Sequence, residues 1–162
     1  MKLAVACDHR GYEAKRRLLP VLKKLGHDVT DFGCENPSSC DYPDFAIPAS
    51  RAVVDGTVEA AILLDGSGIG MSIAANKVFG VRAALAHDQV TARIAREHNH
   101  CNVLCLGTDL LSEDQVRQIV EIFLNTPFAD GRHVRRIDKL RNIEIEERTR
   151  YEAQSEANNV SR

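Results

Sequence analysis

The chain alternates short apolar segments with segments of helical periodicity almost from end to end, and this alternation constrains its fold more than any other feature. Segments predicted to be strands, most of them apolar, lie at residues 3–7, 28–32, 60–64, 81–86 and 103–106. Segments expected to be helical lie between or after them, at 11–25, 44–54, 70–76, 88–98 and 113–125. Strands that alternate with helices in this way form a parallel sheet with helices on both faces.

The C-terminal part of the chain departs from this alternation. A basic stretch runs from Arg132 to Arg141, and within and after it apolar residues recur at helical spacing, at Ile137, Leu140 and Ile143. We expect one further helix there, which packs either on its own domain or on another subunit. The predicted fold class is therefore α/β: a single-domain, Rossmann-like three-layer sandwich with a five-stranded parallel sheet and an extra C-terminal helix. We expect the domain to span 1–150 and a polar, frayed tail to span 151–162.

Charge and cysteine content argue against several classes of protein. A net charge of −2 gives no reason to expect nucleic acid or a membrane as partner. The apolar run at the N-terminus ends at Asp8, too soon for a secretion signal or a membrane span, so we expect a cytoplasmic protein. The five cysteines include no C-x-x-C pair, which argues against a disulfide framework or a zinc ribbon. Cys101 and Cys105, with the nearby histidines, fit buried thiols around a strand better than a metal site.

Polar residues follow several of the predicted strands. Asp8, His9 and Arg10 follow the first strand, Asp65 and a glycine-rich turn follow the third, and the helix after the fourth strand ends at His98 and Asn99. Ligands of open parallel sheets bind beyond the carboxyl ends of the strands. We therefore expect acid–base residues and a glycine loop on one rim of the sheet.

The glycine loop consists of Gly66, Ser67, Gly68, Ile69 and Gly70. Glycines between a strand and a helix let backbone N–H groups turn toward an anion, although the loop could also be a tight turn without a ligand. Met71 stands where a dinucleotide-binding fingerprint would need glycine or alanine, so we expect no nucleotide cofactor. Asp65, directly before the loop, could accept hydrogen bonds from the loop amides or act as a general base.

Five short motifs are similar to those of a known family. They are Cys7-Asp8-His9-Arg10-Gly11-Tyr12, Asp41-Tyr42-Pro43, the glycine loop followed by Ile73-Ala74-Ala75-Asn76-Lys77, Ala95-Arg96-Glu97-His98-Asn99, and Gly131-Arg132-His133-x-x-Arg136. Together they span about Met1 to Arg141, in the family's order. On these residues the chain resembles the ribose-5-phosphate isomerase B group, which also includes the subunits of galactose-6-phosphate isomerase.

The resemblance implies an aldose–ketose isomerase that converts ribose 5-phosphate to ribulose 5-phosphate through an enediolate, with no metal and no cofactor. It also implies a homodimer or homotetramer with shared active sites. One subunit would supply Asp8, His9, Tyr42, Asp65 and the glycine loop, and the other would supply His98, Asn99, Arg132 and Arg136. The catalytic candidates are Asp65, His98, Asp8 and Ser67, with His98 opening the sugar ring. The loop amides would stabilise the enediolate, and Arg132 and Arg136, with His9, would hold the phosphate.

The chain departs from the family pattern at the residues that matter most for proton transfer and phosphate binding. Many members carry a cysteine base where this chain has Asp65, and another branch carries a glutamate at the position of Met71. Many members also have a phosphate-binding arginine where this chain has Asp109, and Arg10 could supply the missing charge.

These departures keep other functions open. The chain could be a galactose-6-phosphate isomerase-like subunit that needs a paralogous partner in a hetero-oligomer, or an isomerase of another pentose, hexose or tetrose phosphate. A non-catalytic module that binds a sugar phosphate is a further alternative. The presence of both the ring-opening and the phosphate-binding residues favours an enzyme.

Overall fold

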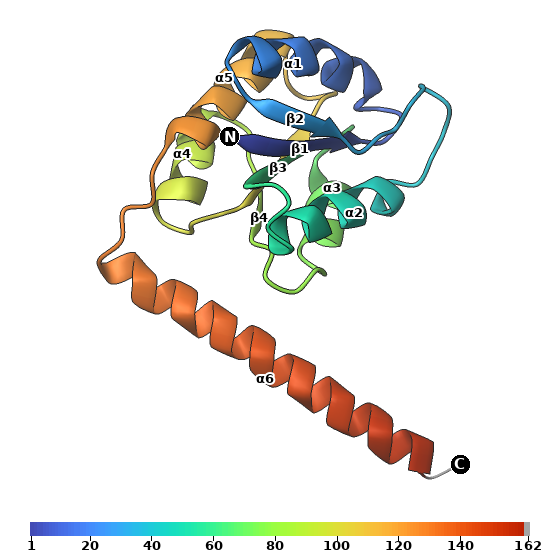
Figure 1. Ribbon diagram of the computed structural model, residues 1–162, viewed down its shortest axis with the longest axis vertical. Helices are drawn as coiled ribbons and strands as arrows, with labels where there is room; N and C mark the ends of the chain where they lie inside the picture. Colours follow the sequence, from blue (N-terminus) through green and yellow to red (C-terminus); the bar gives the residue numbers. More distant parts are fainter. Residues whose placement is uncertain (161–162) are drawn as a thin grey trace. The chain divides into compact units, whose positions relative to one another are not determined.

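The structure is a computed structural model that describes residues 1–160, and it divides into two compact units, Met1–Phe128 and Ala129–Arg162. The first unit contains strands β1 (Lys2–Cys7), β2 (Asp28–Asp31), β3 (Ala60–Asp65), β4 (Ala83–Leu85) and β5 (Val103–Gly107) (Figure 1). Its helices are α1 (Tyr12–Lys24), α2 (Pro43–Val54), α3 (Ile69–Ala75), α4 (Gln89–Glu97) and α5 (Glu113–Asn125). Each strand and helix of this unit lies where the sequence predicts it, with ends shifted by a few residues.

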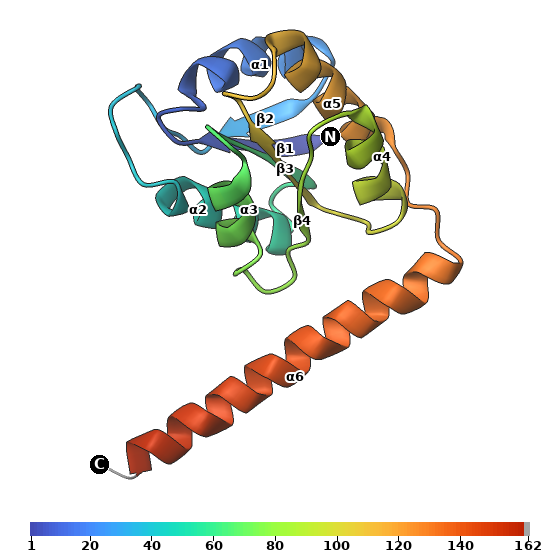
Figure 2. The same ribbon diagram turned by 180° about the vertical axis from the view of Figure 1, so that it is seen from behind.

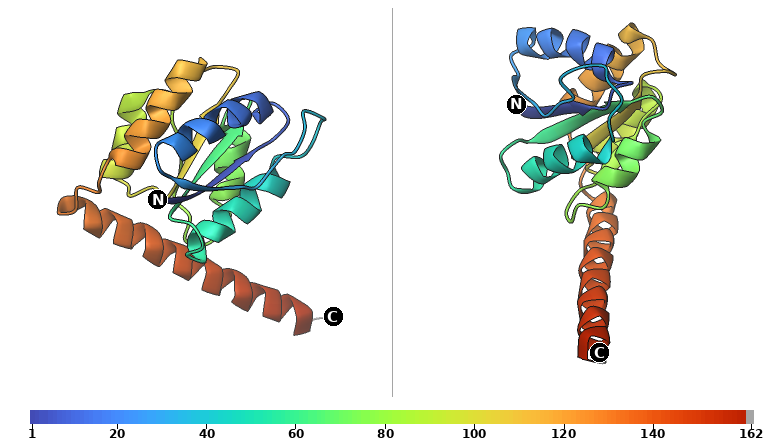
Figure 3. Two further views of the ribbon diagram at one scale, coloured as in Figure 1. Left: turned by 45° about the horizontal axis from the view of Figure 1, so that its top comes forward. Right: turned by 90° about the vertical axis from the view of Figure 1, so that its right-hand side faces the viewer.

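The five strands form one sheet in the order β2-β1-β3-β5-β4, and every neighbouring pair is parallel. Helices α1, α4 and α5 cover one face, and α2 and α3 cover the other (Figures 1 and 2). Figure 3 shows the sheet between these two helix layers. The predicted α/β sandwich with a five-stranded parallel sheet is therefore confirmed.

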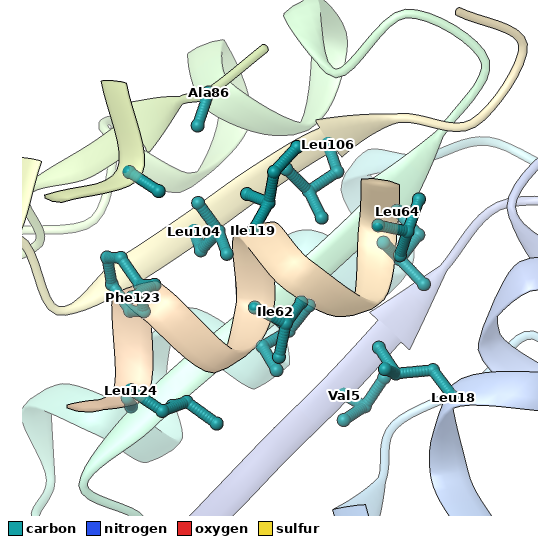
Figure 4. Close-up of a cluster of buried hydrophobic side chains, with 14 of the residues drawn as sticks. Val5, Leu18, Ile62, Leu64, Ala86, Leu104, Leu106, Ile119, Phe123 and Leu124 are labelled. Atoms are coloured by element: carbon teal, nitrogen blue, oxygen red, sulfur yellow. The ribbon is translucent and has the colours of Figure 1, made fainter. Parts of the chain in front are cut away.

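The two faces of the sheet bury different side chains because residues alternate along each strand. Toward α1, α4 and α5 the strands direct large residues such as Val5, Ile62 and Leu104, which pack on Ile119 and Phe123 of α5 (Figure 4). Toward α2 and α3 they direct mostly small residues, which pack on a helix surface made largely of Ala46, Ala49, Ala52, Ala74 and Ala75. The central strands β1, β3 and β5 are thus buried on both faces, as their continuous apolar character predicts.

Strand β4 is shorter than predicted. We expected a strand over 81–86, but only Ala83–Leu85 belongs to the sheet. The backbone N–H of Arg82 donates to the side-chain oxygen of Asn102 (2.8 Å), and that of Ala83 donates to the side-chain oxygen of Asn76 (3.0 Å). Side-chain amides therefore replace a neighbouring strand as hydrogen-bond partners where β4 begins.

The strand order places the candidate site. β1 lies beside β3, and β3 lies beside β5, in a register that pairs Cys7 with Leu64 and Asp65 with Gly107. After β1 the chain passes to β2 on one side of the sheet, and after β3 it passes to β4 on the opposite side. Open sheets bind ligands at such a change of direction, so the carboxyl ends of β1 and β3 are the expected binding position.

The second unit contains helix α6 (Arg132–Val160), which is described by itself. The predicted C-terminal helix is present, and it continues past Tyr151. Ion pairs join Arg148 to Glu152 (3.0 Å) and Glu147 to Arg150 (3.6 Å) on its surface. A domain end near residue 150 and fraying of 151–162 stay predictions, and positions 161 and 162 lie outside the described residues. Within residues 1–160, no helix has the length and apolar character needed to cross a membrane.

Candidate active site

The turns after β1, β3 and β5 meet at the carboxyl edge of the sheet, and glycines allow this close approach. A Cβ atom on Gly107 would lie 2.5 Å from the carbonyl oxygen of Ser67, and one on Gly11 would overlap the carbonyl oxygen of Leu64. Gly68 has a φ of 79°, a left-handed conformation that suits glycine. The glycine loop therefore packs directly on the backbone of its neighbours.

Asp65, the last residue of β3, holds the glycine loop. Its carboxylate accepts hydrogen bonds from the backbone N–H groups of Gly68 and of Met71, the latter at 3.2 Å, and the side chain is buried. Burial raises the pKa of the Asp65 carboxyl, as does the nearby Asp8, whereas the amide hydrogen bonds lower it. Both interpretations of Asp65 from the sequence, loop acceptor and candidate base, are compatible with this geometry.

Asp8 holds the turn after β1 in a similar way. Its buried carboxylate accepts hydrogen bonds from the N–H groups of Arg10 (2.8 Å) and Gly11 (3.1 Å). The next residue, His9, has its ring Nδ1 3.3 Å from both the backbone nitrogen and the backbone oxygen of Cys40. His9 is thereby linked to the loop that leads to Tyr42.

Tyr42 lies against the glycine loop, because a Cβ atom on Gly70 would be only 3.0 Å from the Tyr42 ring. The hydroxyl oxygen of Ser67 accepts a hydrogen bond from the N–H of Ile69 (3.2 Å) within the loop. Asp8, His9, Tyr42, Asp65 and the glycine loop all lie at this carboxyl edge.

Thr108, which follows β5, joins the three turns, and the sequence analysis missed it. Its N–H donates to the Asp65 carbonyl (2.8 Å), and its hydroxyl lies 3.0 Å from that carbonyl and 3.2 Å from the Arg10 carbonyl. The signal that could have found it is its position, directly after the buried strand β5, whose neighbour β3 ends in Asp65.

Arg10 and Asp109 form an ion pair beside the glycine loop. Both Nε (3.1 Å) and Nη2 (2.6 Å) of Arg10 donate to Oδ2 of Asp109. The hydrogen bonds from Arg10 to the Asp109 carboxylate raise the pKa of the guanidinium. The positive charge that we expected Arg10 to supply is therefore at this edge, but it is paired with the carboxylate of Asp109.

His98 and Asn99 do not lie on this rim, which corrects the expectation from the sequence. They follow α4, which runs antiparallel to the strands, and Arg82, at the start of β4, donates from Nε to the Asn99 carbonyl (3.1 Å). The two residues therefore lie at the opposite, amino edge of the sheet. Arg132 and Arg136 belong to α6, in the second unit, which is described by itself.

Four of the five cysteines are buried, in or near the sheet, and Cys40 is half-buried. Cys101 and Cys105 lie just before and within β5, and burial raises the pKa of the Cys101 thiol to about 11. Cys7 and Cys34 have their sulfur atoms 3.6 Å apart. Among residues 1–160, no three His, Cys, Asp or Glu side chains are arranged to share a metal ion.

Comparison with known proteins identifies the family of the chain. The ribose/galactose isomerase family matches residues 3–140. Ribose-5-phosphate isomerase B of Escherichia coli is 36% identical over 143 residues, which cover 88% of this chain and 96% of that protein.

Solved structures show the same fold. Ribose-5-phosphate isomerase B of Clostridium thermocellum is 42% identical and superposes with a TM-score of 0.89, covering 90% of this chain and 99% of that one. The Mycoplasma genitalium enzyme of the same name, with bound ribulose 5-phosphate, is 39% identical with a TM-score of 0.86, covering 90% and 97%. The chain belongs to the ribose/galactose isomerase family. The enzyme class expected from the sequence, aldose–ketose isomerase, is confirmed.

Proposed function

We propose that this enzyme interconverts ribose 5-phosphate and ribulose 5-phosphate in the cytoplasm, in active sites shared between two copies of the chain. The observation that carries the proposal is Asp65, a buried carboxylate fixed beside the glycine-loop amides at the carboxyl edge of the sheet. Proton transfer next to a carbonyl needs a base in reach of the carbon and hydrogen-bond donors for the oxygen that becomes charged. The Asp65 carboxylate and the loop amides at this edge are our candidates for these two roles.

In the proposed reaction, Asp65 removes the proton from C2 of the open-chain aldose, and the electron pair left on C2 forms the enediolate. The proton then returns to C1, and the hydroxyl proton of O2 moves to O1, so atoms and charges balance. A raised carboxyl pKa favours this role, because a base works best when its pKa approaches the working pH. The loop amides that do not bind Asp65 would stabilise the enediolate oxygen, and Asp8 keeps the neighbouring turn in place.

The positions of His98 and Asn99 support a site shared by two copies. Within one copy they lie at the opposite edge of the sheet from Asp65, so a single chain does not bring both groups to one sugar. We propose that His98 of a second copy opens the ring, with Asn99 beside it. Arg132 and Arg136 of that copy, with His9 and Arg10 of the first, would bind the phosphate, since guanidinium groups match phosphate oxygens.

The direct test is turnover by the purified chain without added metal. We expect it to convert ribose 5-phosphate to ribulose 5-phosphate and to exchange the C2 proton with deuterated water. Asp65→Asn should lower kcat roughly 100-fold or more and abolish exchange at C2, because the amide cannot accept the proton. Asp114→Asn, at an exposed carboxylate on α5, is the matched control and should keep full activity. Retained C2 exchange in Asp65→Asn would remove Asp65 from its role as base.

A second candidate substrate class has its own supporting observation. Asp65 and Asp109 are both acidic where many relatives carry cysteine and arginine, and Asp109 takes up part of the charge of Arg10. The same chain could therefore act on a tetrose or hexose phosphate, or need a paralogous subunit. A panel of four-, five- and six-carbon aldose phosphates, assayed with the isolated chain, separates these possibilities. No turnover on any of them would favour the subunit that requires a partner.

A further inference from the structure

We infer that Asp109 is a positioning residue, which holds the Arg10 guanidinium in the orientation that receives the substrate phosphate. The inference rests on the proposed function, because it assigns a role toward a sugar phosphate. It starts from the ion pair between the turn after β1 and the turn after β5. An acidic side chain beside a phosphate site would otherwise only oppose binding.

The geometry of the pair leaves part of the guanidinium available. Asp109 occupies the Nε–Nη2 edge of Arg10 through a single oxygen, Oδ2. The planar guanidinium has a second edge, formed by Nη1 and Nη2, whose two parallel N–H groups match two phosphate oxygens. The Arg10 and Asp109 side chains are 58% and 42% exposed, so a ligand can approach that second edge.

The Asp109 carboxylate is fixed by the glycine loop. The backbone N–H of Asp109 donates to the carbonyl of Gly66 (3.1 Å). A Cβ atom on Gly66 would lie 2.7 Å from Asp109 Oδ2, so the carboxylate fills the space that a side chain at position 66 would need. Asp109 is therefore seated against the same loop that binds Asp65.

The backbone of Arg10 is held as firmly. Its N–H donates to the Asp8 carboxylate (2.8 Å), and its carbonyl lies 3.2 Å from the Thr108 hydroxyl. An exposed arginine normally loses much side-chain freedom when it binds a ligand, which weakens binding. Because Asp109 orders the guanidinium beforehand, part of that loss occurs during folding and not during binding.

A repulsive role and a positioning role of Asp109 predict opposite signs. If the carboxylate only repels phosphate, removal of its charge strengthens phosphate binding. If it positions Arg10, removal weakens binding, even though the site becomes more positive. The sign of the change in affinity therefore decides between the two roles.

The experiment compares Asp109→Ala, Arg10→Met and the double variant. The probe is ribitol 5-phosphate, which lacks a carbonyl and cannot react, titrated by calorimetry alongside KM and kcat for ribose 5-phosphate. We expect each single variant to weaken probe binding and raise KM about tenfold, with kcat changed less than about twofold. The double variant should bind no more weakly than Arg10→Met alone, because the two residues act as a unit.

Glu113→Ala is the matched control. Glu113 pairs with Arg17 across α1 and α5 at 2.8 Å, with exposures of 63% and 56%, so its removal deletes one carboxylate from a comparable ion pair nearby. We expect unchanged or slightly tighter probe binding there. Thermal unfolding of every variant verifies that it folds. Asp109→Asn is a further variant, which keeps the shape of the side chain but not its charge. It should weaken probe binding less than Asp109→Ala does.

The outcomes separate the inference from the proposed function. Equal or tighter probe binding by Asp109→Ala overturns the positioning role, whether or not ribose 5-phosphate is converted. Weaker binding by Asp109→Ala and Arg10→Met supports it, even if ribose 5-phosphate is not turned over, in which case only the proposed substrate fails. No binding of the probe by the unaltered protein overturns the inference, because Arg10 would then have no phosphate to receive.

Discussion

The two edges of the sheet carry the two halves of the proposed site, and they are constructed differently. At the carboxyl edge, main-chain groups at the ends of buried strands bind one another, as when the Thr108 N–H donates to the Asp65 carbonyl (2.8 Å). At the amino edge, arginine side chains help to hold the turn after α4: Arg82 donates to the carbonyls of Asn99 (3.1 Å) and His100 (2.7 Å), and Arg96 donates to that of Cys101 (2.7 Å).

This difference suits the two chemical tasks. Transfer of a proton between adjacent carbons requires a base and oxyanion donors that do not move, and backbone contacts between buried strands supply such rigidity. In the proposed site, ring opening uses His98 of a second copy, and a turn held partly by long arginine side chains can adjust to that contact. The edge that must be rigid is thus the edge tied by its backbone.

The largest effect should come from mixing two inactive variants. Asp65→Asn and His98→Asn should each retain roughly 1% of activity or less, because each removes an acid–base group from every site. Equimolar mixing under conditions that exchange subunits should restore about a quarter of the unaltered activity, since half of the dimers then contain one intact site of two.

The control for this mixing experiment is the double variant Asp65→Asn/His98→Asn, mixed with subunits that carry Asp65→Asn alone. No intact site can form in that mixture, so no activity should return. If the first mixture recovered no activity, with subunit exchange verified by differently tagged copies, the shared site would be contradicted.

A smaller effect should follow from Gly107→Ala. The new Cβ would lie 2.5 Å from the Ser67 carbonyl, so the glycine loop must shift, and we expect a loss of about 1–3 kcal/mol in the free energy of unfolding. We also expect kcat to fall about tenfold, because oxyanion donors lose their alignment. Urea unfolding and steady-state kinetics measure the two effects.

Gly26→Ala provides the comparison for this variant. Gly26 has a φ of 84° and open space around its Cα, so alanine there costs about 1 kcal/mol of backbone strain without a clash. Its kcat should be unchanged. If both variants lowered kcat alike, the rigidity of the carboxyl edge would not be the cause.

The smallest expected effect concerns pH. Because burial raises the pKa of the Asp65 carboxyl in the folded protein, the folded state keeps that proton to a higher pH than the unfolded chain does. The contribution of Asp65 to the free energy of unfolding should therefore fall as pH rises from about 4, the ordinary carboxyl pKa, through the folded-state pKa. Asp65→Asn should lack this slope, whereas Asp114→Asn should keep it. Urea unfolding between pH 4 and pH 8 measures the difference, and parallel slopes in Asp65→Asn and the unaltered protein would contradict it.

Much of the fold could be predicted because its signals are local. The apolar run at 60–64 and the helical spacing of Leu18, Leu22 and their neighbours are visible in short windows of sequence. The length of β4 was not predictable in this way, since it depends on amides from Asn76 and Asn102, which come from other elements.

The residues of the candidate site also differ in how far local sequence patterns predict their positions. Asp8 and Asp65 follow apolar strands, so their shared edge could be inferred from the sequence. The opposite position of His98 was missed, because a helix returns the chain to the far edge of the sheet before that residue is reached. The ion pair of Arg10 with Asp109, 99 residues apart, depends on strand order, which no local pattern reports.

The strand order also bears on how the protein is made. β4 is synthesised before β5, yet in the sheet it pairs only with β5, and one side of β3 pairs with the same strand. While only residues 1–102 of a nascent chain are free to fold, β3 therefore lacks its neighbour on that side, and β4 has no strand to pair with. Completion of the sheet is the insertion of one apolar segment, Val103–Gly107, between two elements that have already left the ribosome.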